Sequence, residues 1–303
     1  MSESHNHHHH HHHQVNGKNL FITIILNVII TISQIIGGIF SGSLALLSDA
    51  MHNFSDVLSL VIAFIANRLA ARPGTHDKTF GYKRAEILAA FFNASALIGI
   101  AVFLIVEALH KFSNPSTINS FWVIALGGLS VVLNALSVFL IKDDAYDNMN
   151  IKAAYLHLLT DVMTSLAVVV GGLLMHYYQV YWVDPIISIM IAIYLIWASS
   201  RLVKDSVCIL MQFSPQEIDV GDVIKTIESL DEIKNAHHIH IWKLNDKSIH
   251  LEVHLDFHNN LLIEESNKIM DDLEHKLHHE FEITHATFQC EYKRDDDKNV
   301  VSI

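Results

Sequence analysis

Residues 20–40 read LFITIILNVIITISQIIGGIF, and none of their side chains is ionisable. A helix of about 20 apolar residues is long enough to cross the hydrocarbon core of a bilayer. Five further runs of similar length and composition follow along the chain, at about 44–66, 87–109, 118–141, 153–175 and 183–200. A soluble helical protein needs polar faces on most of its helices, and these runs do not provide them. The sequence therefore predicts an α-helical membrane bundle of six transmembrane helices.

The composition of the 303 residues excludes several other classes of protein. With 12 Gly and 4 Pro the chain is not of low complexity, and 2 Cys cannot form a disulfide framework or a cysteine-based zinc cluster. A formal net charge of −12 disfavours nucleic acid as a partner. This charge is unevenly distributed, because residues 1–203 carry 10 basic and 11 acidic side chains, whereas residues 204–303 carry 10 and 21. A nearly neutral apolar part thus precedes an acidic part.

The basic residues that flank the apolar runs predict the orientation in the bilayer. Ten of them precede the first run, separate the second from the third and the fourth from the fifth, or follow the sixth: Lys18, Arg68, Arg72, Lys78, Lys83, Arg84, Lys142, Lys152, Arg201 and Lys204. The opposite connections contain only Lys111. Because Lys and Arg are enriched in cytoplasmic loops, we expect both termini to lie in the cytoplasm.

From about Ser214 the pattern becomes that of a soluble domain. Apolar spacing predicts helices at 216–230 and 261–281, and alternation with period two predicts strands at 236–244, 247–257 and 283–292. The resulting order is αββαβ, a small α+β domain. Asn245-Asp246 supplies the turn between the first two strands.

These patterns divide the chain into three expected parts. A His-rich tail occupies residues 1–17, a six-helix transmembrane domain residues 18–205, and a cytoplasmic α+β domain residues 206–303. The seven consecutive His residues in the tail are compatible with a native metal-binding segment and equally with an added tag.

Two predicted membrane helices carry the same pair of side chains. Asp56 follows His52 by four residues in the second run, and Asp161 follows His157 by four residues in the fifth. Side chains four residues apart share one helix face. An ionised Asp at the centre of a membrane helix costs roughly 2.5–3.5 kcal/mol on insertion scales, so packing alone does not justify these residues.

Two imidazoles and two carboxylates can supply the four ligands of a tetrahedral Zn²⁺ site. The alternative is a His–Asp hydrogen bond within each helix and no metal. Because a ligating His is neutral and a ligating carboxylate is ionised, protons and metal compete for such a site. Alternating access to it would couple metal movement to proton movement in the opposite direction.

Four motifs occur in order along the chain: Ser43–Asp56 with its His-x-x-x-Asp, FGYKRAE at 80–86, the second His-x-x-x-Asp at 157–161, and HHIHIW at 237–242. Together they resemble the cation diffusion facilitator family of zinc transporters, and the resemblance covers the chain after residue 17. It implies six membrane helices, a cytoplasmic metallochaperone-like (ferredoxin-like) αββαβ domain, a homodimer, no enzymatic activity, and export of metal in exchange for protons. A bacterial inner membrane is the expected location.

The resemblance also implies roles for particular residues. It assigns the transport ligands to His52, Asp56, His157 and Asp161, a set compatible with zinc and also with cadmium or cobalt. Asp49, one turn before His52, matches an acidic position that the family does not usually count as a ligand, and we interpret it as a hydrogen-bond anchor rather than a proton relay.

A second metal site exists in some family members, in the loop after the second helix. The His positions of that site correspond here to Lys78 and Tyr82. His76 and Asp77 remain as candidate ligands, with an ordinary exposed loop as the alternative.

A third candidate site lies in the C-terminal sheet. His250, Glu252 and His254 alternate onto one face of the second predicted strand. The resemblance points to His237, His254 and His285, with His250 as a fourth candidate, as zinc ligands of a dimerising metal sensor. The alternative is a half-exposed sheet face that binds no metal.

Three other functions compete with zinc export. An exporter of Cd²⁺, Co²⁺ or Fe²⁺ could use the same ligands. A membrane metal sensor without transport would explain the acidic C-terminal part but not the two ligand pairs at mid-bilayer. An intramembrane metalloprotease is disfavoured, because no membrane run contains His-Glu-x-x-His.

Overall fold

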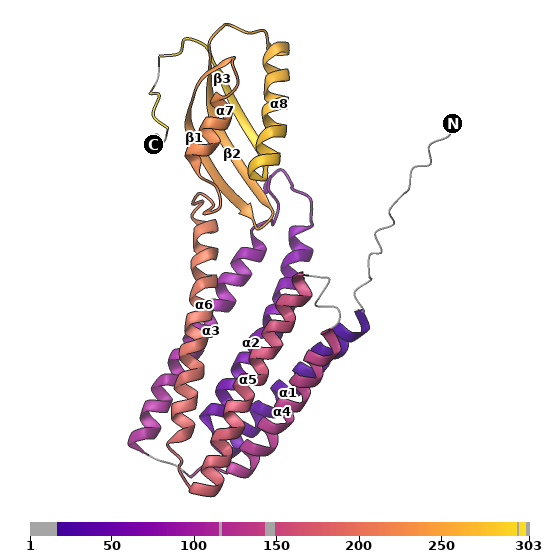
Figure 1. Ribbon diagram of the computed structural model, residues 1–303, viewed down its shortest axis with the longest axis vertical. Coiled ribbons are helices and arrows are strands. Elements are labelled where there is room, and N and C mark those ends of the chain that lie inside the picture. Colours follow the sequence, from indigo (N-terminus) through magenta and orange to yellow (C-terminus); the bar gives the residue numbers. More distant parts are fainter. Residues whose placement is uncertain (1–16, 115–116, 143–148, 296, 301–303) are drawn as a thin grey trace, which may run out of the picture. The chain divides into compact units, whose positions relative to one another are not determined.

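The computed structural model describes residues 17–114, 117–142, 149–295 and 297–300. Six long helices come first in the chain and correspond to the six predicted runs: α1 (Gly17–Ser41), α2 (Leu44–Ala70), α3 (Ala85–Ser113), α4 (Ser120–Ile141), α5 (Met149–Tyr178) and α6 (Val183–Leu210). α4 packs against both α1 and α5 (Figure 1). The predicted His-rich tail lies almost entirely outside the described residues.

Four stretches of the described helices are long and apolar enough to cross a membrane: Ala85–Ser113, Ser120–Leu140, Tyr155–Tyr178 and Val183–Leu210. Ile25–Ser41 in α1 is a shorter apolar stretch. Large apolar side chains on these helices, among them Phe40, Phe139 and Trp197, are mostly exposed. An apolar exterior on helices of this length is the surface that lipid solvates.

Contacts divide the described residues into two compact units, one up to Leu60 together with Ala96–Ser199, and the other Val61–Ser95 together with the residues from Ser200 onward. The first unit has an apolar core to which α2 contributes Leu46, α3 Leu104 and α5 Val168. The predicted boundary between the membrane and cytoplasmic domains near residue 205 stays a prediction.

The first turn of α2 is held by a carboxylate from α6. Asp184 accepts hydrogen bonds from the backbone amides of Leu44 (2.8 Å) and Ala45 (3.2 Å) and from the hydroxyl of Ser43. The first amides of a helix have no partner within the helix itself, and Asp184 is fully buried. Asp184 therefore caps α2 and fixes the start of that helix to α6.

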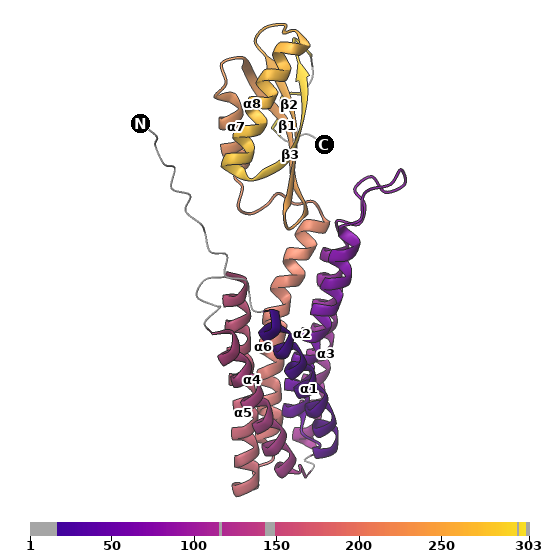
Figure 2. The same ribbon diagram turned by 90° about the vertical axis from the view of Figure 1, so that its right-hand side faces the viewer.

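The C-terminal α/β region (residues 220–300) has the predicted αββαβ order: α7 (Val220–Glu228), β1 (Ile233–Asn245), β2 (Ser248–Phe257), α8 (Ile263–Phe281) and β3 (Ile283–Glu291). The sheet order is β1-β2-β3, and β2 is antiparallel to β1 and parallel to β3. Both helices cover the same face of the sheet (Figure 2). There Ile227 of α7 and Leu273 of α8 pack with Leu251 of β2 in one apolar core.

The opposite face, called here the open face of the sheet, acquires extra His side chains from a bulge in β1. The ladder with β2 shifts register between His237 and His240, and His238 has a positive φ of 52°. One inserted residue lets Ala236 and Ile239 both be buried on the helix side, while His237 and His240 both turn to the open face. The bulge therefore decides which His residues of β1 lie next to β2 on the open face.

Candidate metal centre

The two His-x-x-x-Asp pairs of α2 and α5 face each other. His52 Nε2 lies 3.2 Å from Asp161 Oδ1, and His157 Nε2 lies 3.2 Å from Asp56 Oδ2. Within the helices the distances are longer, 3.7 Å from His52 Nδ1 to Asp56 Oδ2 and 4.0 Å from His157 Nε2 to Asp161 Oδ2. A hydrogen bond within each helix, the metal-free alternative, requires shorter distances than these.

Several atoms of this group have no hydrogen bond of acceptable geometry with any described residue. They are both ring nitrogens of His52, Oδ2 of Asp56 and both carboxylate oxygens of Asp161, and all are buried. Buried polar atoms are nearly always satisfied, so such a concentration calls for a bound partner. Four ligands around a tetrahedral Zn²⁺ lie about 3.3 Å apart, which the two 3.2 Å interhelical distances match. One donor atom from each of the four residues lies within 4.8 Å of the others.

A layer of hydrogen bonds lies one turn away from these side chains. Asp49 Oδ2 on α2 accepts hydrogen bonds from Gln34 Nε2 on α1 and from Ser165 Oγ on α5, the latter at 2.7 Å. Gln34 in turn accepts a hydrogen bond of 2.8 Å from Asn53 Nδ2. All four side chains are fully buried. Asp49 thus joins α1, α2 and α5 immediately beside the candidate ligands.

The loop between α2 and α3 holds the candidates His76 and Asp77. Both side chains are exposed, and the backbone of the flanking residues Thr75 and Lys78 exchanges two 3.0 Å hydrogen bonds. The ammonium of Lys78 donates to the hydroxyl of Tyr82 and lowers the pKa of that phenol. Among the described residues, neither His76 nor Asp77 belongs to a cluster of three or more possible metal ligands.

A second cluster of donors lies on the open face of the sheet. His254 Nδ1 is 3.2 Å from Glu291 Oε1, and His237 Nε2 is 3.5 Å from Glu291 Oε2. Partial burial is the main cause that lowers the pKa of His254, although Glu291 acts in the opposite direction. A lowered pKa keeps the imidazole neutral at pH 7, which is the form that binds metal. The sequence patterns predict both His residues but not Glu291, which is the last residue of β3 and lies outside any motif.

His285 occupies a different place on the open face. It pairs with His250 in the β2–β3 ladder, where the two ring centroids are 5.0 Å apart, and Trp242 stacks on His250 at 5.5 Å. The structure therefore does not bring His285 and His250 to His237 and His254. Neither of them belongs to a ligand cluster found among the described residues.

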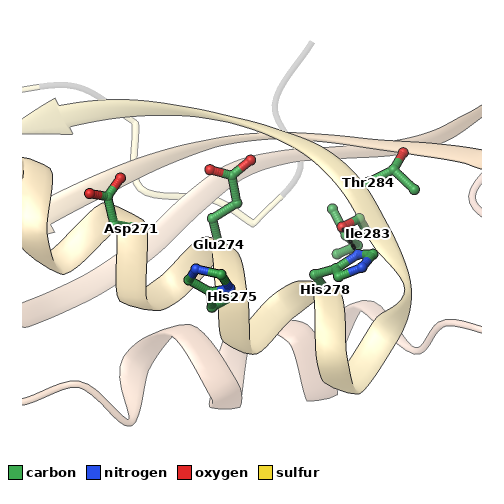
Figure 3. A pocket seen from close by; sticks show the side chains of 6 residues that line it. All are labelled: Asp271, Glu274, His275, His278, Ile283 and Thr284. Carbon is green, nitrogen blue, oxygen red and sulfur yellow. Dashed lines mark hydrogen bonds between the residues drawn. The ribbon is translucent and has the colours of Figure 1, made fainter.

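A pocket where the last turns of α8 meet the start of β3 also contains titratable side chains (Figure 3). Its lining consists of Asp271, Glu274, His275, His278, Ile283 and Thr284. His278 Nδ1 donates to the backbone carbonyl of Ile283 at 3.1 Å. The carboxylates and rings in Figure 3 do not converge on one point, and this group is not among the ligand clusters of the described chain.

Comparison with known proteins identifies the family to which these sites belong. Residues 20–211 match the cation efflux transmembrane domain, and residues 215–293 match the cytoplasmic domain of cation efflux proteins. The chain belongs to the cation efflux family. This is the cation diffusion facilitator family that the four motifs indicated, so the chain is a multi-pass membrane protein of a family of metal efflux transporters.

Several cation efflux proteins are similar over almost the whole chain. The cadmium, cobalt and zinc/H(+)-K(+) antiporter of Bacillus subtilis (strain 168) is 39% identical over 99% of this chain and 95% of the relative. The metal cation efflux system protein CzcD of Cupriavidus metallidurans is 32% identical over 91% and 87%. The zinc transporter ZitB of Escherichia coli (strain K12) is 32% identical over 86% and 82%.

Proposed function

We propose that the chain exports Zn²⁺ from the cytosol in exchange for protons, and that Zn²⁺ crosses the membrane at His52, Asp56, His157 and Asp161. The observation that carries this proposal is the pair of 3.2 Å contacts between α2 and α5. In these contacts the atoms of His52, Asp56 and Asp161 are buried and have no hydrogen bond with another described residue. Two nitrogen and two carboxylate ligands suit tetrahedral Zn²⁺. Mg²⁺ and Ca²⁺ need six or more oxygen ligands, so they fit this donor set poorly.

The same four side chains provide the exchange with protons. Two imidazoles can take up as many as two protons when the metal leaves, and their charge then replaces that of the ion beside the two carboxylates. Without this replacement, the carboxylate of Asp161, whose side chain is 0% exposed, would be left buried and uncompensated. His157, with 43% of its side chain exposed, is the most accessible of the four and gives metal and protons a route to the group.

The name of one relative supports a broader range of transported metals for this chain. The Bacillus subtilis protein is named for cadmium and cobalt as well as zinc, and for potassium beside protons. Co²⁺ and Cd²⁺ accept imidazole and carboxylate ligands, and affinity order alone does not separate them from Zn²⁺. We therefore propose Cd²⁺ and Co²⁺ as further substrates and include a potassium gradient in the test below.

We also propose that the protein is a homodimer in a bacterial plasma membrane with both termini in the cytoplasm. The match of residues 215–293 to the family's cytoplasmic domain supports this arrangement, as does the concentration of basic residues in the connections on that side. In this proposal residues 1–17 are a His-rich cytoplasmic tail, residues 18–205 form the membrane domain, and residues 206–303 form a zinc-sensing cytoplasmic domain.

Metal flux into proteoliposomes that contain the full chain tests the proposal. Zn²⁺, Cd²⁺, Co²⁺, Fe²⁺ and Mn²⁺ are offered in turn, with and without an imposed proton or potassium gradient. We expect Zn²⁺ flux that rises when protons flow in the opposite direction, and that Asp161→Asn abolishes. The matched control is Asp246→Asn, at an exposed turn between β1 and β2.

The outcomes separate the two parts of the proposal. Zn²⁺ flux that is unaffected by Asp161→Asn would exclude the site on α2 and α5. Flux that depends on Asp161 but not on the proton gradient would preserve the site and exclude proton exchange.

A further inference from the structure

The donors on the open face of the sheet already surround a cation of the chain itself. Lys298 Nζ lies 3.1 Å from Glu291 Oε2, 3.1 Å from Asp256 Oδ2 and 3.4 Å from His237 Nε2. An ammonium group only donates, so the His237 nitrogen that faces it accepts. Both carboxylates are buried, with 5% of Glu291 and 7% of Asp256 exposed. Lys298 therefore supplies positive charge to a group of acceptors that is closed to solvent.

Arg294 adds a second positive charge from the same C-terminal segment. Its Nη1 lies 3.0 Å from Glu291 Oε1, the oxygen that also faces His254. Each oxygen of Glu291 is thus within 3.1 Å of a cationic nitrogen from residues 294–298. The two cationic side chains compensate a carboxylate that would otherwise be buried without a partner of opposite charge.

Backbone hydrogen bonds hold this segment in place. The amides of His238 and Ile239, at the bulge in β1, donate to the carbonyls of Asn299 (3.1 Å) and Val300 (2.8 Å). Both amides lie on the edge of β1 that is not paired with β2, because β1 is the outer strand of the three-stranded sheet. The bulge thus provides the two donors that dock residues 299–300.

A metal ion and the Lys298 ammonium cannot share this place. Zn²⁺ bound to His237 Nε2 and a Glu291 oxygen would lie about 2.0–2.2 Å from each of them. Lys298 Nζ lies within 3.4 Å of the same two side-chain atoms, so both cations would occupy the same small volume and repel each other. One has to leave when the other binds.

We propose that Lys298 and a divalent metal ion compete for one cation site formed by His237, His254 and Glu291, and that metal binding there releases residues 297–300 from β1. We call residues 297–300 the latch. In this proposal the latch is bound to β1 when metal is scarce. Its release uncovers the amides of His238 and Ile239 on the edge of the sheet, where unpaired strand edges readily pair with another chain. The inference rests on metal binding in the cytoplasmic part and is independent of transport between α2 and α5.

Hydrogen–deuterium exchange on the full chain in detergent tests the latch, with Zn²⁺ alone as the probe. The Asp161→Asn background removes metal binding at the transport site. We expect Zn²⁺ to accelerate exchange in a peptide that contains His238 and Ile239, and Glu291→Gln to abolish that acceleration. Lys298→Gln should accelerate the same exchange without Zn²⁺ and tighten Zn²⁺ binding roughly 5-fold or more, because it removes the competitor.

Two matched variants control for general effects on the fold. Lys298→Arg keeps the positive charge and should preserve slow exchange and weaker Zn²⁺ binding. Lys293→Gln changes an ammonium that lies over the Tyr292 ring instead, and it should behave as the unsubstituted chain. Zn²⁺ that binds and slows exchange at His238 and Ile239, or an affinity unchanged by Lys298→Gln, would overturn the latch. An absence of Zn²⁺ binding in the Asp161→Asn background would also overturn the latch. It would not affect the proposed transport between α2 and α5, which the flux assay tests separately.

Discussion

Ser165 on α5 donates a 2.7 Å hydrogen bond to Asp49 on α2, one helical turn from the candidate ligands on both helices. Ser165 is also 2.8 Å from the hydroxyl of Ser130 on α4, and Asp49 accepts from Gln34 on α1. Four helices therefore meet in one layer of buried hydrogen bonds. This layer holds α2 and α5 in the register that brings His52 to Asp161.

Asp49→Asn should weaken Zn²⁺ binding at the proposed transport site roughly tenfold, because it disturbs buried hydrogen bonds between α2 and α5, and such a loss costs about 1–3 kcal/mol. Ser165→Ala should act in the same direction and more weakly, since Gln34 remains bonded to Asp49. Equilibrium binding of Zn²⁺ to the full chain checks both. The double variant should lose less than the sum of the two single losses, since both remove the same contact. Strictly additive losses of Zn²⁺ binding free energy would contradict a shared role. Ser33→Ala, at an exposed α1 hydroxyl, serves as the control.

Asp184→Ala should lower the stability of the membrane helices by about 1–2 kcal/mol, the range for loss of a helix cap. Asp184→Asn keeps one acceptor oxygen for the amides of α2 and should have an intermediate effect. Thermal unfolding midpoints of the full chain in one detergent provide the comparison. Asn114→Ala, at an exposed side chain directly after the end of α3, is the reference. Equal midpoints for Asp184→Ala and this reference would show that the cap is dispensable.

His250 should titrate below its ordinary value of 6.5, since burial first, and then the nearby His285 and Lys83, lower its pKa. As pH falls through 6.5, the unfolded chain binds a proton that the folded imidazole resists, so the C-terminal α/β region loses stability on acidification. Trp242 stacks on this ring, and its fluorescence should report the titration. The measured signal is the fluorescence of the unsubstituted chain minus that of the Trp242→Phe variant, recorded from pH 5 to 8. A midpoint at or above 6.5 would refute the prediction.

His76→Ala combined with Asp77→Ala should leave the number of bound Zn²⁺ ions unchanged, because both side chains are exposed and lie outside the ligand clusters of the described chain. Metal analysis of the purified protein after dialysis measures this number. Loss of one bound ion in the double variant would instead establish a metal site in the loop between α2 and α3.

The membrane helices and the order of the C-terminal elements could be predicted from the sequence, because both depend on local periodicity. The helices extend beyond their apolar runs, as α6 does to Leu210 instead of ending near residue 200. Polar residues in those extensions carry no hydrophobic signal. The parallel pairing of β2 with β3 also could not be derived, because strand pairing depends on contacts between distant segments.

The two candidate metal clusters differ in how far the sequence could define them. The candidate transport ligands lie at helical spacing in apolar runs, where each polar side chain is conspicuous. The cluster on the open face depends on strand register and on the bulge at His238, and neither has a signature in one sequence. Glu291 and Lys298 could not be predicted for that reason, since both are ordinary charged residues among many in an acidic part of the chain.

The cap that Asp184 provides for α2 also bears on how the protein is made. Leu44 is synthesised 140 residues before the carboxylate that binds its amide. The first amides of α2 have no partner within that helix, so its start gains this anchor only when α6 has entered the bilayer. Two of the four candidate zinc ligands lie on α2, so this half of the candidate centre lacks a fixed helix start until α6 is in place. We therefore expect the candidate metal centre to become rigid only in the fully inserted protein.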